Sequence, residues 1–227
     1  MITLTEVKKE YSMPQEKLLV LDIAKLNFEQ GIQAVLVGPS GSGKTTILKL
    51  IAGLIKPNQG DVIVDGMKIN QLDEAKRDNY RRQRIGYIAQ GFNLMSNLTA
   101  LENVMLAIYL TEASSKAKQR EEANKLLKLM GLAARKHHLP KELSKGEVQR
   151  VAIARSLASR ADIILADEPT GNLDYKTGKD IMTLLKEICQ KNKITLITAT
   201  HDQQLAASFN KSVNLLDINQ ALAEVIV

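Results

Sequence analysis

Three short apolar runs are the clearest hydrophobic pattern in the chain. They span Ala34–Val37, Ile163–Ala166 and Ile194–Ala199, and each passes directly into loop residues. Continuous apolar runs of this length are typical of strands that are buried on both faces of a mostly parallel sheet. The pattern therefore predicts an α/β fold, with a mostly parallel sheet at its centre.

The N-terminal third of the chain has a different pattern. Residues 2–8 and 18–28 alternate between apolar and polar side chains, which is typical of half-buried strands. The segment Asp61–Ile69 is predicted to be a hairpin that turns at Asp65-Gly66, since this dipeptide favours tight turns. We therefore expect a small antiparallel β subdomain near the N-terminus.

Helical periodicity fills much of the remaining chain. A stretch rich in Leu, Lys, Glu and Ala, from about Thr99 to Met130, is predicted to be a helical insertion on the α/β core. The segments after the three apolar runs are predicted to be helices that begin near Lys44, Thr177 and Asp202. Alternating sheet and helix of this kind indicates a layered α/β architecture.

Length and composition suit one folded unit. The 227 residues are 44% hydrophobic and 25% charged, which is ordinary globular composition. No internal repeat or low-complexity linker divides them. We therefore expect a single domain over residues 1–227, with a core formed by residues 1–90 and 160–227 and a helical subdomain at about 91–159.

Cysteine content and hydropathy indicate the compartment. Cys189 is the single cysteine, and it lies in a helical pattern that predicts a packing role. No apolar run approaches the roughly 18 residues needed to cross a bilayer, and the N-terminus lacks the apolar stretch of a signal peptide. We expect a cytosolic protein, unless a partner holds it at a membrane.

The net charge of +6 is compatible with phosphate ligands, an anionic membrane surface or nucleic acid. Aromatic residues are only 4% of the chain, which argues against stacking platforms for single-stranded nucleic acid. A basic cluster is predicted to decorate a solvated helix, with contact to a partner as the alternative. Its members are Arg77, Arg81, Arg82 and Arg84.

A phosphate-binding loop follows the first apolar run. The sequence GPSGSGKT fits the pattern G-x-x-x-x-G-K-[ST] between a strand and a helix, which is the context that this motif requires. Its glycines let successive backbone N–H groups point at one phosphate, and the helix N-terminus adds favourable potential. Lys44 is expected to contact the β- and γ-phosphates, and the Thr45 hydroxyl to bind Mg²⁺. The predicted nucleotide-binding residues here are Gly38, Pro39, Ser40, Gly41, Ser42, Gly43, Lys44, Thr45 and Thr46.

Two carboxylates end the second apolar run. We assign Asp167 to the Mg²⁺ ion and Glu168 to the base that orients or deprotonates an attacking water. An acidic pair in this position can also cap the next helix. Because a phosphate-binding loop accompanies the pair, hydrolysis is the favoured interpretation.

A third motif is more specific than the first two. The segment Leu143–Arg150 (LSKGEVQR), followed by Val151–Arg155 (VAIAR), resembles the signature motif of ABC ATPases. The resemblance extends over essentially the whole chain. The family's other motifs follow in the expected order. Tyr11 is similar to the aromatic residue that stacks on adenine, and Gln90 is similar to the Q-loop residue. Gly171–Asp174 resembles the D-loop, and His201 resembles the switch histidine.

The resemblance implies that two such chains meet head to tail, each ATP lying between the P-loop of one and the signature helix of the other. Ser144 and Gly146 would then face the γ-phosphate, and Asp174 would lie at the composite site. Gln90 would contact Mg²⁺ and the reacting groups, and His201 the γ-phosphate. Ser144 is also predicted to be a helix N-cap, and the two roles are compatible.

The chain departs from the family pattern in its signature. Lys145 stands where the family usually has the first glycine of LSGGQ, and Glu147 stands in place of glutamine. A side chain at 145 must point away from the phosphate or add positive charge beside it. These differences bear on the rate of hydrolysis more than on ATP binding.

The segments Arg84–Leu94 and Leu98–Val104 resemble the branch that includes lipoprotein-release, macrolide-export and cell-division ATPases. That resemblance implies an integral membrane permease as the partner, gripped by the region after Gln90, with the chain peripheral on the inner face of the cell membrane. Import ATPases remain an alternative, as do ABC-type ATPases that act on DNA or ribosomes, although their usual insertions are absent. A P-loop kinase would leave Glu168 and His201 unexplained.

Overall fold

A five-stranded parallel sheet forms the centre of the computed structural model, which describes residues 1–12, 14, 16–111 and 114–222. The strand order is β6-β7-β8-β3-β9, and all four pairs are parallel. The predicted apolar runs are β3, β7 and β8, so the expected parallel core is confirmed. The strand bounds are β3 (Gln33–Val37), β6 (Ile85–Ile88), β7 (Ile163–Asp167), β8 (Thr195–Thr200) and β9 (Lys211–Asn214).

The predicted antiparallel β region is a separate four-stranded sheet with the order β2-β1-β4-β5. Asp65 and Gly66 join β4 to β5 with φ of 47° and 81°. Positive φ at both central residues suits a two-residue hairpin, because it matches the twist of the paired strands. The strands are β1 (Ile2–Ser12), β2 (Lys17–Phe28), β4 (Gln59–Val64) and β5 (Met67–Lys68).

The long predicted helical insertion consists of two helices, so the helical character predicted for this stretch is confirmed. The second helix begins after Ser115, whose hydroxyl accepts a hydrogen bond from the N–H of Lys118 and caps the new helix. Residues 112–113 of the predicted stretch lie outside the described residues. The helices are α1 (Lys44–Ile51), α2 (Glu74–Arg84), α3 (Ala100–Thr111), α4 (Lys116–Leu129), α5 (Lys145–Leu157), α6 (Tyr175–Lys191), α7 (Gln203–Ala206) and α8 (Leu215–Ile218).

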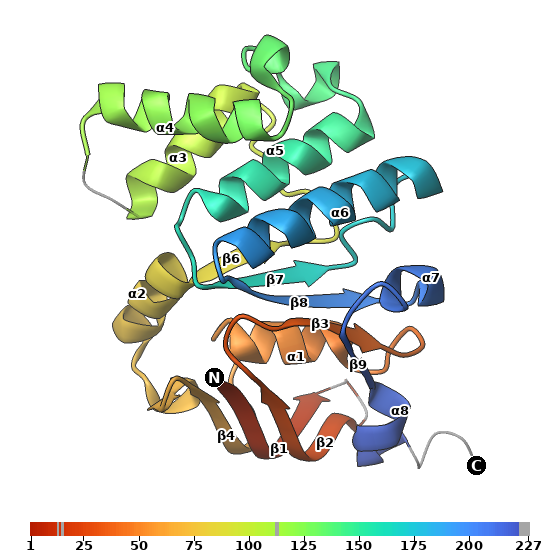
Figure 1. Cartoon of the computed structure of the whole chain (residues 1–227). Coiled ribbons are helices and arrows are strands. Elements are labelled where there is room, and N and C mark those ends of the chain that lie inside the picture. The colour runs from red at the N-terminus through yellow and green to blue at the C-terminus, as the bar shows by residue number, and fades with distance from the viewer. Residues whose placement is uncertain (13, 15, 112–113, 223–227) are drawn as a thin grey trace.

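Two hydrophobic cores cover the two faces of the parallel sheet (Figure 1). Ile164 and Ala166 of β7 face a core that includes residues of α3, α4, α5 and α6. Ile163 and Leu165, which alternate with them, face the core that contains α1 and the antiparallel sheet. Burial on both faces explains why these strands are continuously apolar in the sequence.

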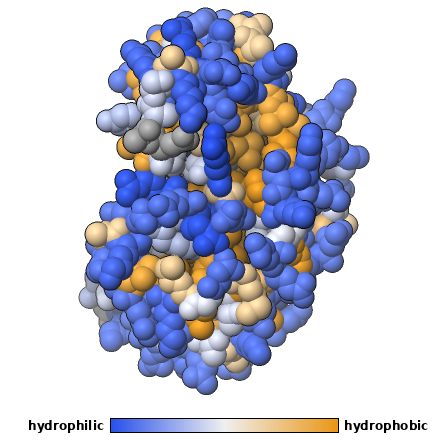
Figure 2. Space-filling model, turned by 60° about the vertical axis from the view of Figure 1, so that its left-hand side comes forward, coloured by the Kyte–Doolittle hydropathy of each residue, from blue (hydrophilic) through white to orange (hydrophobic). Residues whose placement is uncertain are grey.

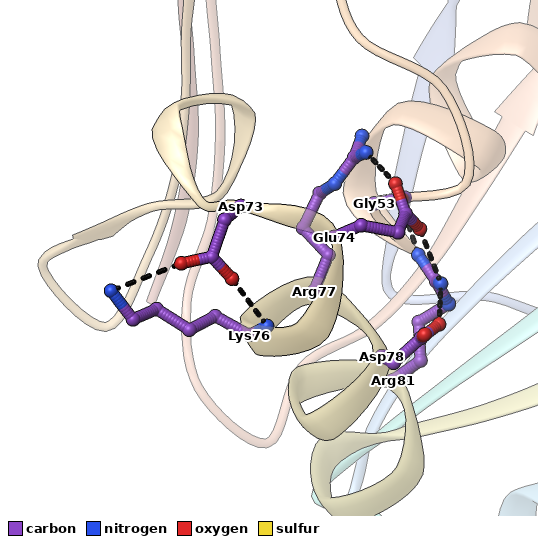
Figure 3. A network of polar contacts seen from close by, with 7 residues as sticks. All are labelled: Gly53, Asp73, Glu74, Lys76, Arg77, Asp78 and Arg81. Atoms are coloured by element: carbon purple, nitrogen blue, oxygen red, sulfur yellow. Dashed lines mark hydrogen bonds and ion pairs between the residues drawn. The ribbon is translucent and has the colours of Figure 1, made fainter.

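The basic cluster lies on α2, and the prediction of a solvated helix is confirmed because Tyr80 is its one buried residue. Acidic neighbours pair with much of its charge (Figure 3). Arg77 pairs with Glu74, and Arg81 pairs with Glu74 and Asp78. Arg81 also donates to the carbonyl of Gly53 at 2.7 Å, and Tyr80 Oη to that of Ile51 at 2.8 Å. Helix α2 therefore braces the C-terminal end of α1.

Cys189 is buried in α6, and burial raises the pKa of its thiol to about 12. A thiol with a raised pKa is almost entirely protonated near neutral pH, so it is a poor nucleophile. The predicted packing role of this cysteine is therefore confirmed. No helix in the described part of the chain combines the length and the apolar character needed to span a bilayer.

Gly86 lets α5 approach β6 closely. A Cβ atom at this position would lie 2.5 Å from the carbonyl oxygen of Ser156 on α5 and 2.4 Å from Cδ1 of Ile164 on β7. Both distances are well below van der Waals contact, and the Ser156 oxygen belongs to helix backbone that cannot rotate away. The glycine therefore sets the distance between the sheet and the helix that carries the signature motif.

We predict that Gly86→Ala destabilises the protein by about 1–3 kcal/mol, the usual cost of overpacking a core. Chemical denaturation measures the change. Gly91→Ala is the matched control, because its new Cβ would meet only the side-chain oxygen of Asn93, at 3.4 Å. Equal stability of the two variants would show that α5 can move away from the sheet at little cost.

Candidate functional site

The phosphate-binding loop joins β3 to α1, and its backbone requires glycine at several positions. Gly41 and Gly43 have φ of 82° and 96°, in the left-handed region that side chains disfavour. At Gly43 space is also limiting, because a Cβ would lie 2.4 Å from Cδ2 of Leu21 on β2. The antiparallel sheet is therefore one wall of the loop.

Lys44 begins α1 and turns its side chain back over the loop. Its Nζ donates to the carbonyl oxygens of Gly38 and Pro39, both at 2.8 Å. Burial lowers the pKa of Lys44, whereas the negative charges of Glu168 and Asp167 act in the opposite direction. The ammonium group is thus held where the loop, the helix N-terminus and two carboxylates meet.

Thr45 and Asp167 bring two side-chain oxygen atoms together at the N-terminus of α1. The Thr45 hydroxyl donates to Oδ1 of Asp167 at 3.0 Å. Burial raises the pKa of Asp167, and the neighbouring charge of Glu168 raises it further, whereas the Thr45 hydrogen bond lowers it. A buried carboxylate with this set of neighbours suits a hard divalent cation, which prefers oxygen ligands.

Glu168 joins three segments that are distant in the sequence. Its Oε2 accepts a hydrogen bond from Nε2 of Gln90 at 3.3 Å, and its Oε1 lies 3.0 Å from Nδ1 of His201. Glu168 itself has φ of 45°, which is uncommon for a residue with a side chain. The three side chains that the sequence assigned to catalysis are therefore in direct contact. Strained backbone at this point is typical of functional sites.

Asn172 of the D-loop segment and Arg155 of the signature helix support Gln90 and the segment after it, although the sequence analysis gave neither residue a role of its own. Asn172 donates from Nδ2 to the carbonyl of Gln90 at 3.1 Å. The guanidinium group of Arg155 on α5 donates to the carbonyls of Phe92, at 3.0 Å, and Asn93. Phe92 and Asn93 both have positive φ, so this segment needs such support. The sequence carries no local signal for these contacts, because the partners are far apart along the chain.

The signature segment begins α5, and its departures from the family pattern have structural consequences. Ser144 Oγ accepts a hydrogen bond from the N–H of Glu147 at 3.3 Å, and Glu147 Oε2 accepts one from the N–H of Ser144 at 2.8 Å. This capping box, together with an ion pair between Glu147 and Arg135, accounts for glutamate at 147. Lys145 is exposed.

Gly146 has a packing role within its own chain. A Cβ there would lie 2.8 Å from Cγ2 of Thr177, so glycine lets the start of α5 approach the start of α6. Asp174 caps α6, because its Oδ1 accepts a hydrogen bond from the N–H of Thr177 at 3.0 Å. That bond lowers the pKa of Asp174. The start of the signature helix is therefore packed against the first turn of α6, which follows the D-loop directly.

The signature helix does not reach the phosphate-binding loop of the same chain. In Figure 1 the loop between β3 and α1 lies at the lower right, whereas the first turn of α5 lies at the upper right. Strands β7 and β8 and helix α6 separate them in this view. The predicted ligands Ser144 and Gly146, at the start of α5, are therefore not brought together with Lys44.

Tyr11 lies on the strand next to the wall of the loop. It pairs with Leu18 of β2, three positions from the Leu21 that meets Gly43. At about 3.4 Å per residue, this places Tyr11 roughly 10 Å along the strand from the loop. Nζ of Lys9 lies 5.3 Å from the centre of the Tyr11 ring.

Comparisons with known proteins agree with these motifs. The family model described as ABC transporter matches residues 21–171. The chain is 44% identical over 220 residues to the uncharacterised ABC transporter ATP-binding protein MJ0796 of Methanocaldococcus jannaschii, covering 96% of this chain and 94% of that protein. It is 40% identical over 214 residues to the lipoprotein-releasing system ATP-binding protein LolD of Treponema denticola, covering 94% of each.

A longer relative and a solved structure extend the likeness. The chain is 42% identical over 218 residues to the macrolide export ATP-binding/permease protein MacB of Rhodopirellula baltica, covering 96% of this chain but 32% of that protein. The dimeric structure of MJ0796 in a post-hydrolysis state, bound to ADP and Pi, superposes with a TM-score of 0.89 at 40% identity. It covers 97% of this chain and 95% of that one.

The raised pKa of Asp167 generates a pH-dependent prediction. Above its folded-state pKa the ionised carboxylate costs stability, whereas below its unfolded-state pKa both states bind the proton and the cost disappears. Asp167→Asn keeps an oxygen for Thr45 and removes the charge. We therefore expect this variant, without nucleotide, to melt above the wild type at pH 7. Each 1 kcal/mol of relief corresponds to about 2–4 °C in a chain of this size.

The gain in melting temperature should shrink as the pH falls through the folded-state pKa of Asp167. Differential scanning calorimetry from pH 7 down to pH 4 measures it. Asp162→Asn is the control, because this aspartate is mostly exposed and pairs with Arg84. A variant at 167 that is less stable than the wild type at neutral pH would contradict the inferred cost of burying the charge.

Proposed function

Because the chain belongs to the ABC transporter family, we propose that it hydrolyses ATP as the nucleotide-binding subunit of a membrane transporter. The contact of Glu168 with both Gln90 and His201, beside the phosphate-binding loop, is the observation that carries this proposal. A P-loop kinase would have no use for this arrangement. Residues 1–90 and 160–227 would form the nucleotide-binding core, and residues 91–159 the helical subdomain.

ATP would bind with its phosphates in the loop of residues 38–46 and its adenine against the ring of Tyr11. Lys44 would exchange its two carbonyl partners for β- and γ-phosphate oxygens, which attract an ammonium group more strongly. Mg²⁺ would be held by the Thr45 hydroxyl, by Asp167 and by the amide oxygen of Gln90. When bound, this ion neutralises phosphate charge.

Hydrolysis requires a water molecule aligned with the γ-phosphate. Glu168 would accept a proton from this water while the water oxygen bonds to the γ-phosphorus and the bond to the bridging oxygen of ADP breaks. The products are ADP and inorganic phosphate. Gln90 and His201 keep the Glu168 carboxylate in place, and His201 would contact the γ-phosphate.

The site would be completed by a second copy of the chain. Ser144 and Gly146 lie at the N-terminus of α5, where a hydroxyl is also present, and helix N-termini favour phosphate oxygens. Since this end of α5 lies away from the chain's own loop, a head-to-tail dimer would bring it to the ATP of the partner, with Asp174 at the same interface. MJ0796, the relative described above, forms a dimer in its solved structure.

A groove on the face that carries α2 and α3 would receive the membrane permease. It encloses about 560 Å³, and the exposed Leu110 of α3 and Arg82 of α2 are among its lining residues. Figure 2 shows apolar side chains gathered in the middle of this face, between the upper and lower parts of the molecule. The lining comes from β6, α2, α3 and α5. The α3 part of this lining belongs to the region after Gln90, which the resemblance assigned to the groove.

Contacts connect this groove to the site. Arg155 lines the groove and holds the carbonyls of Phe92 and Asn93, two and three residues after Gln90. A permease segment in the groove would therefore act on Gln90, and through it on Glu168. This path supports a subunit that is peripheral on the inner face of the membrane and drives export or mechanotransmission, as the lipoprotein-release and macrolide-export relatives suggest.

Replacing the base tests the hydrolytic mechanism. Glu168→Gln keeps the shape of the side chain but cannot accept a proton, so we expect ATP turnover to fall at least about 100-fold while ATP still binds. The variant should accumulate as a dimer with ATP in size-exclusion chromatography. Turnover at the wild-type rate would mean that another group is the base.

A charge in the groove tests the transporter assignment. Leu110→Glu should reduce recovery of a polytopic membrane protein with the tagged chain from detergent-solubilised membranes by about tenfold, the effect of losing one buried apolar contact worth 1.4 kcal/mol. Leu129→Glu, an equally exposed leucine on α4 outside the groove, should retain the partner. Co-purification of DNA or ribosomes instead of a membrane protein would favour the alternative class of ABC ATPase.

A further inference from the structure

Asn219 is a buried polar residue that lies between α8 and the 3-10 turn η4 (Gln220–Leu222), far along the sequence from the phosphate-binding loop. Only 2% of its surface is exposed. Its Oδ1 accepts a hydrogen bond from the N–H of Asp22 at 2.8 Å. Its Nδ2 donates to the carbonyls of Val20, at 2.9 Å, and Ser42, at 3.2 Å. One side-chain amide therefore joins the C-terminal segment, the antiparallel sheet and the phosphate-binding loop.

The bonds to β2 complete an irregular strand edge. β2 is the outer strand of its sheet, and the pairing register passes from Leu21 opposite Lys9 to Leu19 opposite Glu10. Val20 is thus an extra residue in a bulge, which bends a strand and leaves a peptide group unpaired. Its carbonyl lies against the loop, 3.3 Å from where a Cβ of Gly43 would be. Asn219 supplies the partner that the bulge lacks.

The bond to Ser42 fixes the orientation of one peptide group in the loop. In a trans peptide the carbonyl and the following N–H point in opposite directions. When Asn219 holds the Ser42 carbonyl toward β2, the N–H of Gly43 must point to the other side, into the loop. Gly43 is buried, and no acceptor for its N–H is found among the described residues. An unpaired buried N–H is costly unless a ligand accepts from it.

We propose that Asn219 is a positioning residue for nucleotide binding, which aims the N–H of Gly43 at a phosphate oxygen of the bound nucleotide. The inference rests on the proposed function, in which the loop is the phosphate site. Leu215 of α8 packs near the other end of the same loop, with its Cβ 3.5 Å from where a Cβ of Gly38 would be. The C-terminal segment therefore holds the loop at both ends.

Two substitutions separate the bonds. Asn219→Ala removes all three, whereas Asn219→Asp keeps the shape and the acceptor for Asp22 but replaces the two donated bonds by repulsion between oxygens. Isothermal titration calorimetry with MgADP should give a dissociation constant raised about tenfold for Asn219→Ala, corresponding to one hydrogen bond of about 1.4 kcal/mol. Asn219→Asp should weaken binding at least as much.

Asn103→Ala is the matched control. Asn103 is fully buried, and its side chain also bonds to backbone groups, those of Met95, Leu98 and Thr99 in the segment before α3. Its loss should lower the melting temperature as much as Asn219→Ala does, without changing the dissociation constant of MgADP. A purely structural role for Asn219 would make the two variants alike in both measurements.

Three results would overturn the proposal. The first is that a folded Asn219→Ala variant binds MgADP within twofold of the wild type. The second is that Asn103→Ala loses as much affinity as Asn219→Ala. The third is that MgADP does not shift the amide resonance of Gly43 in the wild type. The last measurement decides the matter if neither Asn219 variant folds. Lys44→Ala separates a failure of the proposed function from a failure of the role of Asn219, because unchanged MgADP affinity in that variant would refute the phosphate site itself. Weak binding by Lys44→Ala with normal binding by Asn219→Ala would refute only the role of Asn219.

Discussion

Parallel pairing of β7 with β8 and of β8 with β3 is the constraint on which the site depends. Parallel strands end at the same edge of a sheet, so the residues that follow each strand become neighbours about 5 Å apart. Here the edge collects the phosphate-binding loop after β3, Asp167 and Glu168 at the end of β7, and His201 after β8. The register pairs Asp167 with Ala199, whose carbonyl accepts the N–H of Glu168 at 2.9 Å. The contact between Glu168 and His201 is a direct consequence of that register.

The same edge of the sheet gathers groups that lower the stability of the fold when no ligand is bound. Burial raises the pKa of Asp167 and lowers that of Lys44, so both are held away from the ionisation that water would favour. Glu168 has a left-handed backbone, as do Phe92 and Asn93 beyond the Q-loop residue. Strain and charge burial of this kind persist where surrounding packing enforces them, and they are typical of sites whose ligand relieves the cost. Here β2 and the C-terminal segment supply the packing that surrounds the phosphate-binding loop.

Within one chain the site is only half of the arrangement that the family resemblance implies. The signature turn is packed by Gly146 against Thr177, and is capped by Ser144 and Glu147, on a part of the molecule that its own loop does not reach. Glu147 belongs to that cap and also forms an ion pair with Arg135, which glutamine could not form, so one departure from the family pattern has a local explanation. Lys145 precedes Gly146 with an exposed side chain, and nothing in the single chain explains why it replaces glycine. Arg155 links the other end of the same helix to the segment after Gln90, so α5 connects the surface proposed to complete a second ATP site with the groove proposed for the permease.

Local chemistry and periodicity were sufficient to predict much of this protein from its sequence. The phosphate-binding loop, the carboxylates of β7, the buried strands and the Asp65-Gly66 hairpin each depend on residues within one short segment. The division of the predicted Thr99–Met130 insertion into two helices was not predicted, and the serine cap before α4 marks it in the structure. The supporting contacts of Asn172, Arg155 and Asn219 were decided only by the tertiary structure. Asn219 and Ser42 are 177 residues apart, and no local pattern specifies a bond that exists only after the chain has folded.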